Sequence, residues 1–262
     1  MKNHFIKKIK LQGPITVSEY MSDCLLSPKK GYYNLKNTIG SKGDFITSPE
    51  ISQIFGELIG LSLVDYWYQC QKPELPILTD LGGGNGTMLK DALRAINQVD
   101  KNLRALIKPI FIESSLTLTN KQIKIIPDSS SFKDISEIPK GFLMLYANEF
   151  FDALPIHQFI KIKNNWHERL IDIDSSDNLQ FIYNNKPSPY EKIFPKNLRN
   201  NQLIELSPSA INILSSLTKR ILETGGIVII IDYALSHNDL FGSLQAIKDH
   251  KYIDPLREPG NS

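Results

Sequence analysis

The feature that most constrains the fold is a set of four short apolar segments that alternate with stretches of helical pattern. Each segment is a nearly continuous run of Ile, Leu, Val or Phe, as is typical of parallel strands that helices cover on both faces. The segments are Pro76–Leu81, Pro109–Glu113, Phe142–Ala147 and Ile227–Asp232. A weaker fifth candidate for a strand is Gln122–Ile126.

Helical patterns lie between these segments. The candidate helices are Thr87–Ile96, Leu116–Lys121 and Ala210–Leu222, and Gly225-Gly226 supplies a stop between the last helix and the last strand. Strands that alternate with helices predict an α/β fold, here a Rossmann-like, doubly wound parallel sheet.

Two regions depart from this alternation. Residues 1–70 precede the first strand and are expected to be mainly helical. Within them, Ser48 suits the N-cap and Pro49 the first position of an amphipathic helix that carries Ile51, Ile54, Phe55, Leu58 and Ile59. We therefore expect an N-terminal helical region, residues 1–70, followed by the sheet domain, residues 71–262.

The second departure is Ile156–Tyr183, which contains three segments of β-like pattern. These are His157–Ile162, Trp166–Ile173 and Leu179–Tyr183. Asn164-Asn165 is the expected turn between the first two, because Asn tolerates positive φ. The pattern predicts a β-meander inserted between the fourth and fifth parallel strands.

A glycine-rich turn follows the first strand. It runs Asp80-Leu81-Gly82-Gly83-Gly84-Asn85-Gly86 and leads directly into a predicted helix. Glycine allows the backbone to approach a ligand closely, and the helix start behind the turn offers unpaired N–H groups to a carboxylate or a phosphate. Three glycines that destabilise the chain without a use are less expected than three that bind a ligand.

The spacing of this turn bears on which ligand it binds. Gly82, Gly84 and Gly86 form the pattern GxGxG, whereas the dinucleotide pattern GxGxxG would need a glycine where Thr87 stands. The acid that ends the second strand, Glu113, can accept the ribose hydroxyls of either cofactor. The GxGxG spacing and the two acids, Asp80 before the first glycine and Glu113, together favour S-adenosylmethionine (SAM). A nicotinamide-dependent oxidoreductase remains the alternative.

Polar residues also follow the fourth strand, in the segment 146–155. In open α/β sheets ligands lie beyond the carboxyl ends of the strands, so Asn148, Glu149 and Asp152 are candidates to position a substrate and remove its proton. The alternative is that Asn148 caps a helical turn and that the two acids are merely solvated.

The composition excludes several other classes of protein. A formal net charge of +2, from 30 basic and 28 acidic residues, gives no sign of nucleic-acid binding. The two cysteines and five histidines show no spacing of a metal site. We expect no signal peptide and no membrane span, and hence a soluble protein inside the cell.

Longer motifs give the chain a family resemblance. They include the segments 43–53 and 55–60, the glycine turn, Asn148–Pro155, Trp166–Arg169, Ile231–Tyr233 and the segment 254–260. In these motifs the chain resembles the MidA family of SAM-dependent methyltransferases, whose mitochondrial members act in the assembly of respiratory complex I. The resemblance covers nearly the whole chain.

The resemblance implies SAM as cofactor and, as in mitochondrial members, methylation of an arginine in a protein substrate such as a complex I subunit. Gly82, Gly84, Gly86 and Glu113 would then bind SAM. The segment that contains Asp44, Thr47, Pro49 and Glu50 would help to close the active site. The implied location is the bacterial cytoplasm or the mitochondrial matrix.

The chain also departs from the family pattern. Gly83 and Asn85 stand where the family turn usually has Pro and Arg, and family members continue well beyond the Pro259-Gly260 motif. We therefore expect the last two strands of the sheet to be absent and the preceding strand to have an open edge. The alternative function that this favours is a non-catalytic assembly or interaction module. The oligomeric state is left open.

Overall fold

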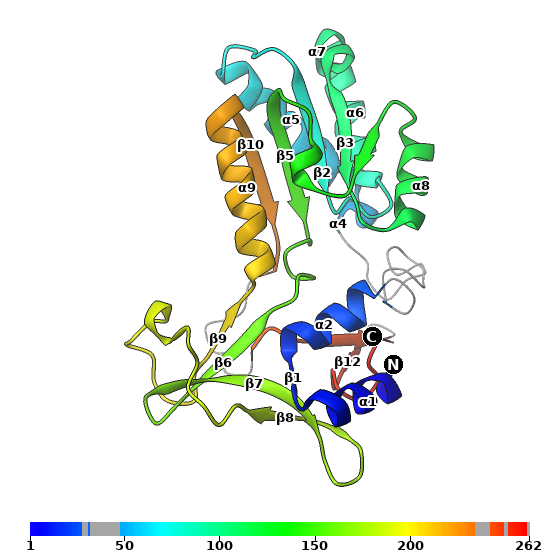
Figure 1. The fold of residues 1–262 in the computed structure, drawn as a ribbon. Coiled ribbons are helices and arrows are strands. Elements are labelled where there is room, and N and C mark those ends of the chain that lie inside the picture. The colour runs from blue at the N-terminus through cyan, green and yellow to red at the C-terminus, as the bar shows by residue number, and fades with distance from the viewer. Residues whose placement is uncertain (28–30, 32–47, 234–241, 249–250, 261–262) are drawn as a thin grey trace. The chain divides into compact units, whose positions relative to one another are not determined.

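The structure is a computed structural model that describes residues 1–27, 31, 48–233, 242–248 and 251–260 (Figure 1). The chain divides into two compact units. One unit combines Met1–Lys36, Ala153–Ser209 and Ala234–Ser262, and the other combines Asn37–Asp152 with Ala210–Tyr233. This division differs from the expected boundary near residue 70, and the expectation that residues 1–70 cover the active site stays a prediction.

The second unit is built on a parallel sheet of five strands in the order β10-β5-β2-β3-β4. The strands are β2 (Pro76–Leu81), β3 (Lys108–Ile112), β4 (Ser130–Phe132), β5 (Phe142–Asn148) and β10 (Gly226–Ile231). Thus all four main apolar segments are strands, as predicted. Among the described residues, β10 pairs with β5 and has no second neighbour in the sheet.

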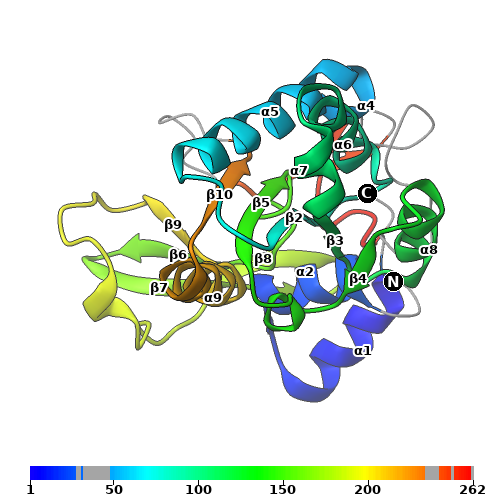
Figure 2. The same cartoon turned by 90° about the horizontal axis from the view of Figure 1, so that it is seen from above.

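Helices cover both faces of this sheet (Figures 1 and 2). The helices of the unit are α4 (Ser48–Ile51), α5 (Gln53–Gln69), α6 (Thr87–Val99), α7 (Lys101–Leu106), α8 (Leu116–Ile125) and α9 (Pro208–Thr224), with a short 3₁₀ helix η1 (Ile135–Glu137). Residues of α5 and α6 pack on one face of the sheet, and Leu217 of α9 packs on the other. The α9 helix ends at Thr224, directly before Gly225, which has φ +75°, so the predicted stop is confirmed.

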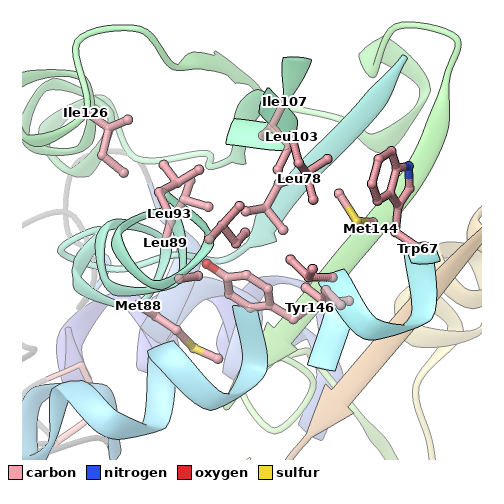
Figure 3. Packing of buried hydrophobic residues seen from close by; sticks show 14 of the residues in the cluster. Trp67, Leu78, Met88, Leu89, Leu93, Leu103, Ile107, Ile126, Met144 and Tyr146 are labelled. Atoms are coloured by element: carbon pink, nitrogen blue, oxygen red, sulfur yellow. The ribbon is translucent and has the colours of Figure 1, made fainter. Parts of the chain in front are cut away.

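The larger core lies between α5, α6 and the sheet (Figure 3). Its central side chains are almost fully buried, among them Leu78, Leu89 and Tyr146. The helices approach one another closely because α5 presents glycines to α6. A Cβ atom on Gly60 would lie 2.8 Å from the Cα atom of Ala92, and one on Gly56 would lie 2.9 Å from the Met88 carbonyl oxygen.

The helix that was predicted to start at Ser48 is interrupted. The Ser48–Ile51 turn ends before Ser52, whose side chain accepts the N–H of Ile54 (3.3 Å) and caps α5. The predicted apolar face is only partly correct: Phe55 and Ile59 pack against the core, whereas Ile51, Ile54 and Leu58 are exposed and the glycines of the helix are buried. A serine inside the apolar repeat competes with the helix for backbone N–H groups, which the repeat alone does not reveal.

The fifth candidate strand, Gln122–Ile126, is also wrong. The helix α8 extends to Ile125, with Ser115 accepting the N–H of Leu118 at its start, and the strand of this connection is Ser130–Phe132. An apolar run of this length is ambiguous between helix and strand, and here the N-cap and the preceding helical turns decide for the helix.

The first unit contains α1 (Lys2–Gln12), α2 (Val17–Leu26) and a five-stranded antiparallel sheet. Its strands are β1 (Ile15–Thr16), β6 (His157–Ile162), β7 (Asn165–Ile173), β8 (Leu179–Tyr183) and β9 (Leu203–Leu206). A short 3₁₀ helix η2 (Glu191–Ile193) and a hairpin of β11 (Ala246–Lys248) and β12 (Lys251–Ile253) complete it. The predicted meander is confirmed as β6-β7-β8, although its first turn is centred on Lys163 and Asn164, one residue earlier than expected.

The glycine contact between α5 and α6 leads to a test of stability. We expect Gly60→Ala to lower the free energy of unfolding by about 1–3 kcal/mol, because its Cβ would overlap backbone atoms of Ala92. The loss should occur although Ala favours a helix over Gly by about 1 kcal/mol. Urea unfolding measures the change. Ser62→Ala on the exposed side of the same helix is the control, and a stability gain in Gly60→Ala would contradict the packing described.

Candidate active site

The glycine turn between β2 and α6 uses a backbone that other residues rarely adopt. Gly82, Gly84 and Gly86 all have positive φ, at +77°, +51° and +83°. The N–H of Gly82 donates to the carbonyl of Ile112 on β3 (3.0 Å), and the N–H of Gly86 donates to Gly83 (2.8 Å). The three glycines of the predicted pattern are therefore the ones that require glycine for conformational reasons.

Asp80 lies beneath this turn. Its carboxyl is 2% exposed and accepts the Tyr146 hydroxyl (2.9 Å), and a Cβ atom on Gly83 would come within 2.7 Å of it. Burial raises the pKa of Asp80 to about 7, and the Tyr146 hydrogen bond opposes that rise. Asp80 thus supports the turn from below, and its predicted contact with a cofactor stays a prediction.

Glu113 follows the last residue of β3. One carboxylate oxygen accepts the N–H of Ser115 (2.8 Å), and the other lies 3.4 Å from the amide nitrogen of Gln122. Burial raises the pKa of Glu113, while the hydrogen bonds from Ser115 and Gln122 act in the opposite direction. The sequence indicated Glu113 but missed Gln122, because a single glutamine in a helix carries no motif.

The short helix α4 contacts the glycine turn through Glu50. A carboxylate oxygen of Glu50 accepts the Thr87 hydroxyl (2.9 Å) and the Asn85 amide (3.3 Å). Pro49 beside it is buried. Of the residues expected to close the site, these two are placed near the turn, whereas Asp44 and Thr47 lie outside the described residues.

Asn148 and Glu149 stand at the end of β5. The side-chain oxygen of Asn148 is buried and has no hydrogen-bond partner among the described residues. Glu149 has φ +49° and donates its N–H to the carbonyl of Ile231 on β10 (2.9 Å). Burial raises the pKa of the Glu149 carboxyl, which receives hydrogen bonds from the Tyr233 hydroxyl, the Ser48 N–H and Asn148. A left-handed glutamate with a half-buried, hydrogen-bonded carboxyl is unusual in a merely solvated turn.

The turn after Glu149 is held by Asp232. One oxygen of its carboxylate accepts the N–H groups of both Phe151 and Asp152 (3.0 Å each), and the other accepts the N–H of Tyr233 (2.8 Å). Asp152 itself is exposed. The sequence placed Asp232 and Tyr233 in a family motif without a role, and only the pairing of β10 with β5 shows their contact with the turn.

The strand register brings these groups to one edge of the sheet. Leu81 is level with Ile112 of β3 and with Ala147 of β5, and Ile231 of β10 is level with Asn148. The turn after β5 also contacts the glycine turn, since a Cβ atom on Gly82 would lie 2.5 Å from the Phe150 ring. The glycine turn, Glu113 and the segment Asn148–Asp152 thus form a single candidate site.

The described part of the chain offers neither a cluster of metal ligands nor a membrane-spanning helix. No group of three or more His, Cys, Asp or Glu residues there is arranged to hold a metal ion. None of its helices is long and apolar enough to cross a membrane.

Comparisons with known proteins agree on one family. The sequence model of a family of S-adenosyl-L-methionine-dependent methyltransferases matches residues 58–262. The mitochondrial protein arginine methyltransferase NDUFAF7 of Xenopus laevis is 37% identical over 99% of this chain and 65% of its own length. The human protein of that name is 36% identical over 100% of this chain and 65% of its own length. The chain therefore spans slightly less than two thirds of these relatives.

Solved structures give the same fold. A Burkholderia thailandensis protein bound to S-adenosyl-homocysteine superposes with a TM-score of 0.80 at 18% identity, covering 99% of this chain and 70% of the other. A second crystal structure of a protein from that organism gives a TM-score of 0.78 at 19% identity, with the same coverage. At this identity the likeness concerns the fold.

The buried carboxyl under the turn leads to a prediction about pH. The folded-state pKa of Asp80, about 7, exceeds the unfolded value of about 3.9, so the unfolded state loses its proton first. The stabilisation is present below about pH 4 and is lost as the pH rises to about 7. In Asp80→Asn, whose amide oxygen can still accept from Tyr146, this loss should be absent. The free energy of unfolding should then fall by up to about 4 kcal/mol less between pH 4 and pH 7 than in the unaltered protein.

Urea unfolding at pH 4.5 and pH 7.5 gives the change in the free energy of unfolding between the two pH values, for Asp80→Asn and for the unaltered protein. Asp65→Asn, which changes an exposed carboxyl, is the control. An identical pH dependence in the Asp80→Asn and unaltered proteins would show that burial does not raise the pKa of Asp80.

Proposed function

The chain belongs to this family of S-adenosyl-L-methionine-dependent methyltransferases and has its class I methyltransferase fold, and from that premise we propose that it is a protein arginine methyltransferase. The observation that carries the proposal is the arrangement of three features at one sheet edge. These are the glycine turn, the partly buried carboxylate of Glu113 and the acceptor pair Asn148 and Glu149. The names of the relatives support arginine as the methylated residue.

The residues present fit SAM. Apart from Asn85, whose side chain donates to Glu50, the turn is built of glycines, so the carboxylate end of SAM could approach the backbone N–H groups before α6. The Glu113 carboxylate accepts hydrogen bonds from the N–H groups of Ser114 and Ser115 and from the Gln122 amide, and it retains acceptor capacity for a ribose hydroxyl. The turn and Glu113 would therefore hold the two ends of the cofactor's polar part.

The chain's own residues would position the accepting nitrogen and take up its proton. SAM, when bound, supplies a methyl group on a sulfonium, and the sulfur keeps the bonding electron pair when that group leaves. The side-chain oxygen of Asn148 would accept an N–H of the nitrogen that attacks. The Glu149 carboxylate would orient the guanidinium by a charge-assisted hydrogen bond and accept the proton released from the methylated nitrogen.

The finer identity of the substrate is also part of the proposal. We expect the methylated arginine to lie in a protein, and a subunit of complex I is the candidate that the family resemblance suggests. The relatives are named as mitochondrial proteins, which supports a mitochondrial or corresponding bacterial location for the reaction.

Cofactor binding is the first test of this function. Isothermal titration calorimetry should show saturable binding of SAM to the whole chain. Gly84→Val should abolish measurable binding, because a β-branched residue does not tolerate φ +51°. Glu113→Gln should weaken binding by about tenfold, the equivalent of one charge-assisted hydrogen bond.

Glu74→Gln, which changes an exposed carboxyl, is the matched control and should bind SAM as the unaltered protein does. If the folded, unaltered protein binds no SAM, the proposed function is wrong. If NAD binds more tightly than SAM, an oxidoreductase replaces it.

Methyl transfer is the second test. We expect Glu149→Gln to lower kcat by about 10²–10⁴-fold while SAM affinity is unchanged, because the variant cannot accept the proton. Asp152→Asn should have a smaller effect, since Asp152 is exposed. The rate should rise with pH as Glu149 ionises, because burial raises its pKa. The assay follows labelled methyl groups from SAM to synthetic peptides that each contain one arginine.

Peptides with lysine in place of arginine, and the Glu74→Gln variant, are the controls. Transfer that is unaffected by Glu149→Gln would remove Glu149 from the reaction. A chain that binds SAM but methylates none of these peptides and no protein of the cells it comes from would favour the non-catalytic module.

A further inference from the structure

Gln122 is a buried polar side chain that joins two parts of the candidate site. It lies on α8 with 0% exposure. Its amide nitrogen donates to the carbonyl oxygen of Gly84 (2.9 Å) and lies 3.4 Å from a carboxylate oxygen of Glu113. Its Cγ atom would lie 3.5 Å from a Cβ atom placed on Gly86. One side chain thus contacts the glycine turn and the acid of the next strand.

This glutamine is not explained by stability alone. Its side-chain oxygen is buried and has no hydrogen-bond partner among the described residues. Burying an amide oxygen without a partner costs free energy, which offsets part of what the bonds to Gly84 and Glu113 contribute to stability. A polar side chain with an unpartnered buried atom at such a position is expected to serve the site as well as the core.

The two hydrogen bonds act on the two parts of SAM that the site would hold. Because a trans peptide is planar, holding the Gly84 carbonyl toward Gln122 directs the N–H of Asn85 to the opposite side. On Glu113, the bonds from Gln122 and from the Ser115 N–H engage one oxygen each and fix the plane of the carboxylate. The same bonds favour its charged form.

We propose that Gln122 is a positioning residue for SAM, which fixes the Gly84 peptide and holds Glu113 as an oriented carboxylate for the ribose hydroxyls. The inference rests on the proposed function, since it concerns the same cofactor. It assigns the residue that makes the turn and Glu113 act as one binding site.

The role of Gln122 in keeping Glu113 charged predicts a dependence on pH. Without the donor, the pKa of Glu113 should rise further, so the affinity for SAM should fall as the pH is lowered. The other titratable group near Glu113 in the described chain is Asp80 on β2, whose pKa is about 7. Measurements at pH 5.0 and pH 6.5 both lie below that value, which keeps Asp80 mainly neutral.

Calorimetry with SAM on the full chain tests the proposal. Gln122→Met should bind SAM about five- to tenfold more weakly at pH 6.5, the effect of one or two hydrogen bonds. The loss should be larger at pH 5.0. Because Gln122→Met also removes the donor to the buried Gly84 carbonyl, its thermal unfolding midpoint serves as the check on folding, and the pH dependence of SAM affinity is the readout that a merely structural role would not change. Asn120→Ala, on the exposed side of α8, is the control.

Gln122→Glu is a second variant that keeps the volume and is available if Gln122→Met does not fold. Its ionised carboxylate cannot donate and repels Glu113, so it should bind SAM weakly at pH 6.5. The defect should shrink at pH 5.0, where protonation restores a donor, which is the opposite trend to that of Gln122→Met.

The outcomes separate the two ideas. An unaltered protein that binds SAM, together with Gln122 variants that bind it equally well, overturns the role of Gln122 and leaves the proposed function standing. A loss of the same factor at both pH values also overturns it, because the carboxylate would then not be involved. An unaltered protein that binds no SAM overturns the proposed function and this inference with it.

Discussion

The candidate site depends on the parallel register of the central strands. Because Leu81, Ile112 and Ala147 are level with one another, the residues that follow them emerge at the same edge of the sheet. Those residues are the first glycine of the turn, Glu113 and Asn148. An antiparallel arrangement would place alternate strand ends at opposite edges and separate them. The parallel direction of the strands is therefore enough to bring the residues of the candidate site to one edge of the sheet.

Burial of acids is the second common property of this edge. Burial raises the pKa values of Asp80, Glu113 and Glu149, so each carboxyl is costly to ionise in the free protein. A ligand that brings positive charge would lower that cost, and the sulfonium of SAM and a guanidinium both carry such charge. In the interior of a site, where the effective dielectric constant is low, this compensation is stronger than it would be in water. The acids are thus better suited to a cationic ligand than to a dinucleotide phosphate.

The sequence could predict the features that depend on local pattern. The strand Pro76–Leu81 was expected with its observed bounds, and the three left-handed glycines were the three of the predicted pattern. Contacts between distant segments could not be predicted in this way. Gln122 was assigned to a strand, although its place on α8 is what lets it reach Gly84 and Glu113. The break at Ser52, the cap of α5, likewise reflects a competition that an apolar repeat does not show.

Asp232 joins two segments of the parallel-sheet unit that are far apart in the sequence. The chain leaves the parallel-sheet unit after Asp152 and again after Tyr233, and Asp232 accepts N–H groups from residues at both exits. The two exits are therefore fastened to each other directly beside Glu149, whose own N–H is bonded to Ile231. A left-handed glutamate costs free energy and persists only where its surroundings enforce it. The hydrogen bonds to Ile231 of β10 and to Asp232 directly after it hold the turn in this conformation. The geometry of the candidate catalytic turn is therefore set by a segment that lies far from it in the sequence.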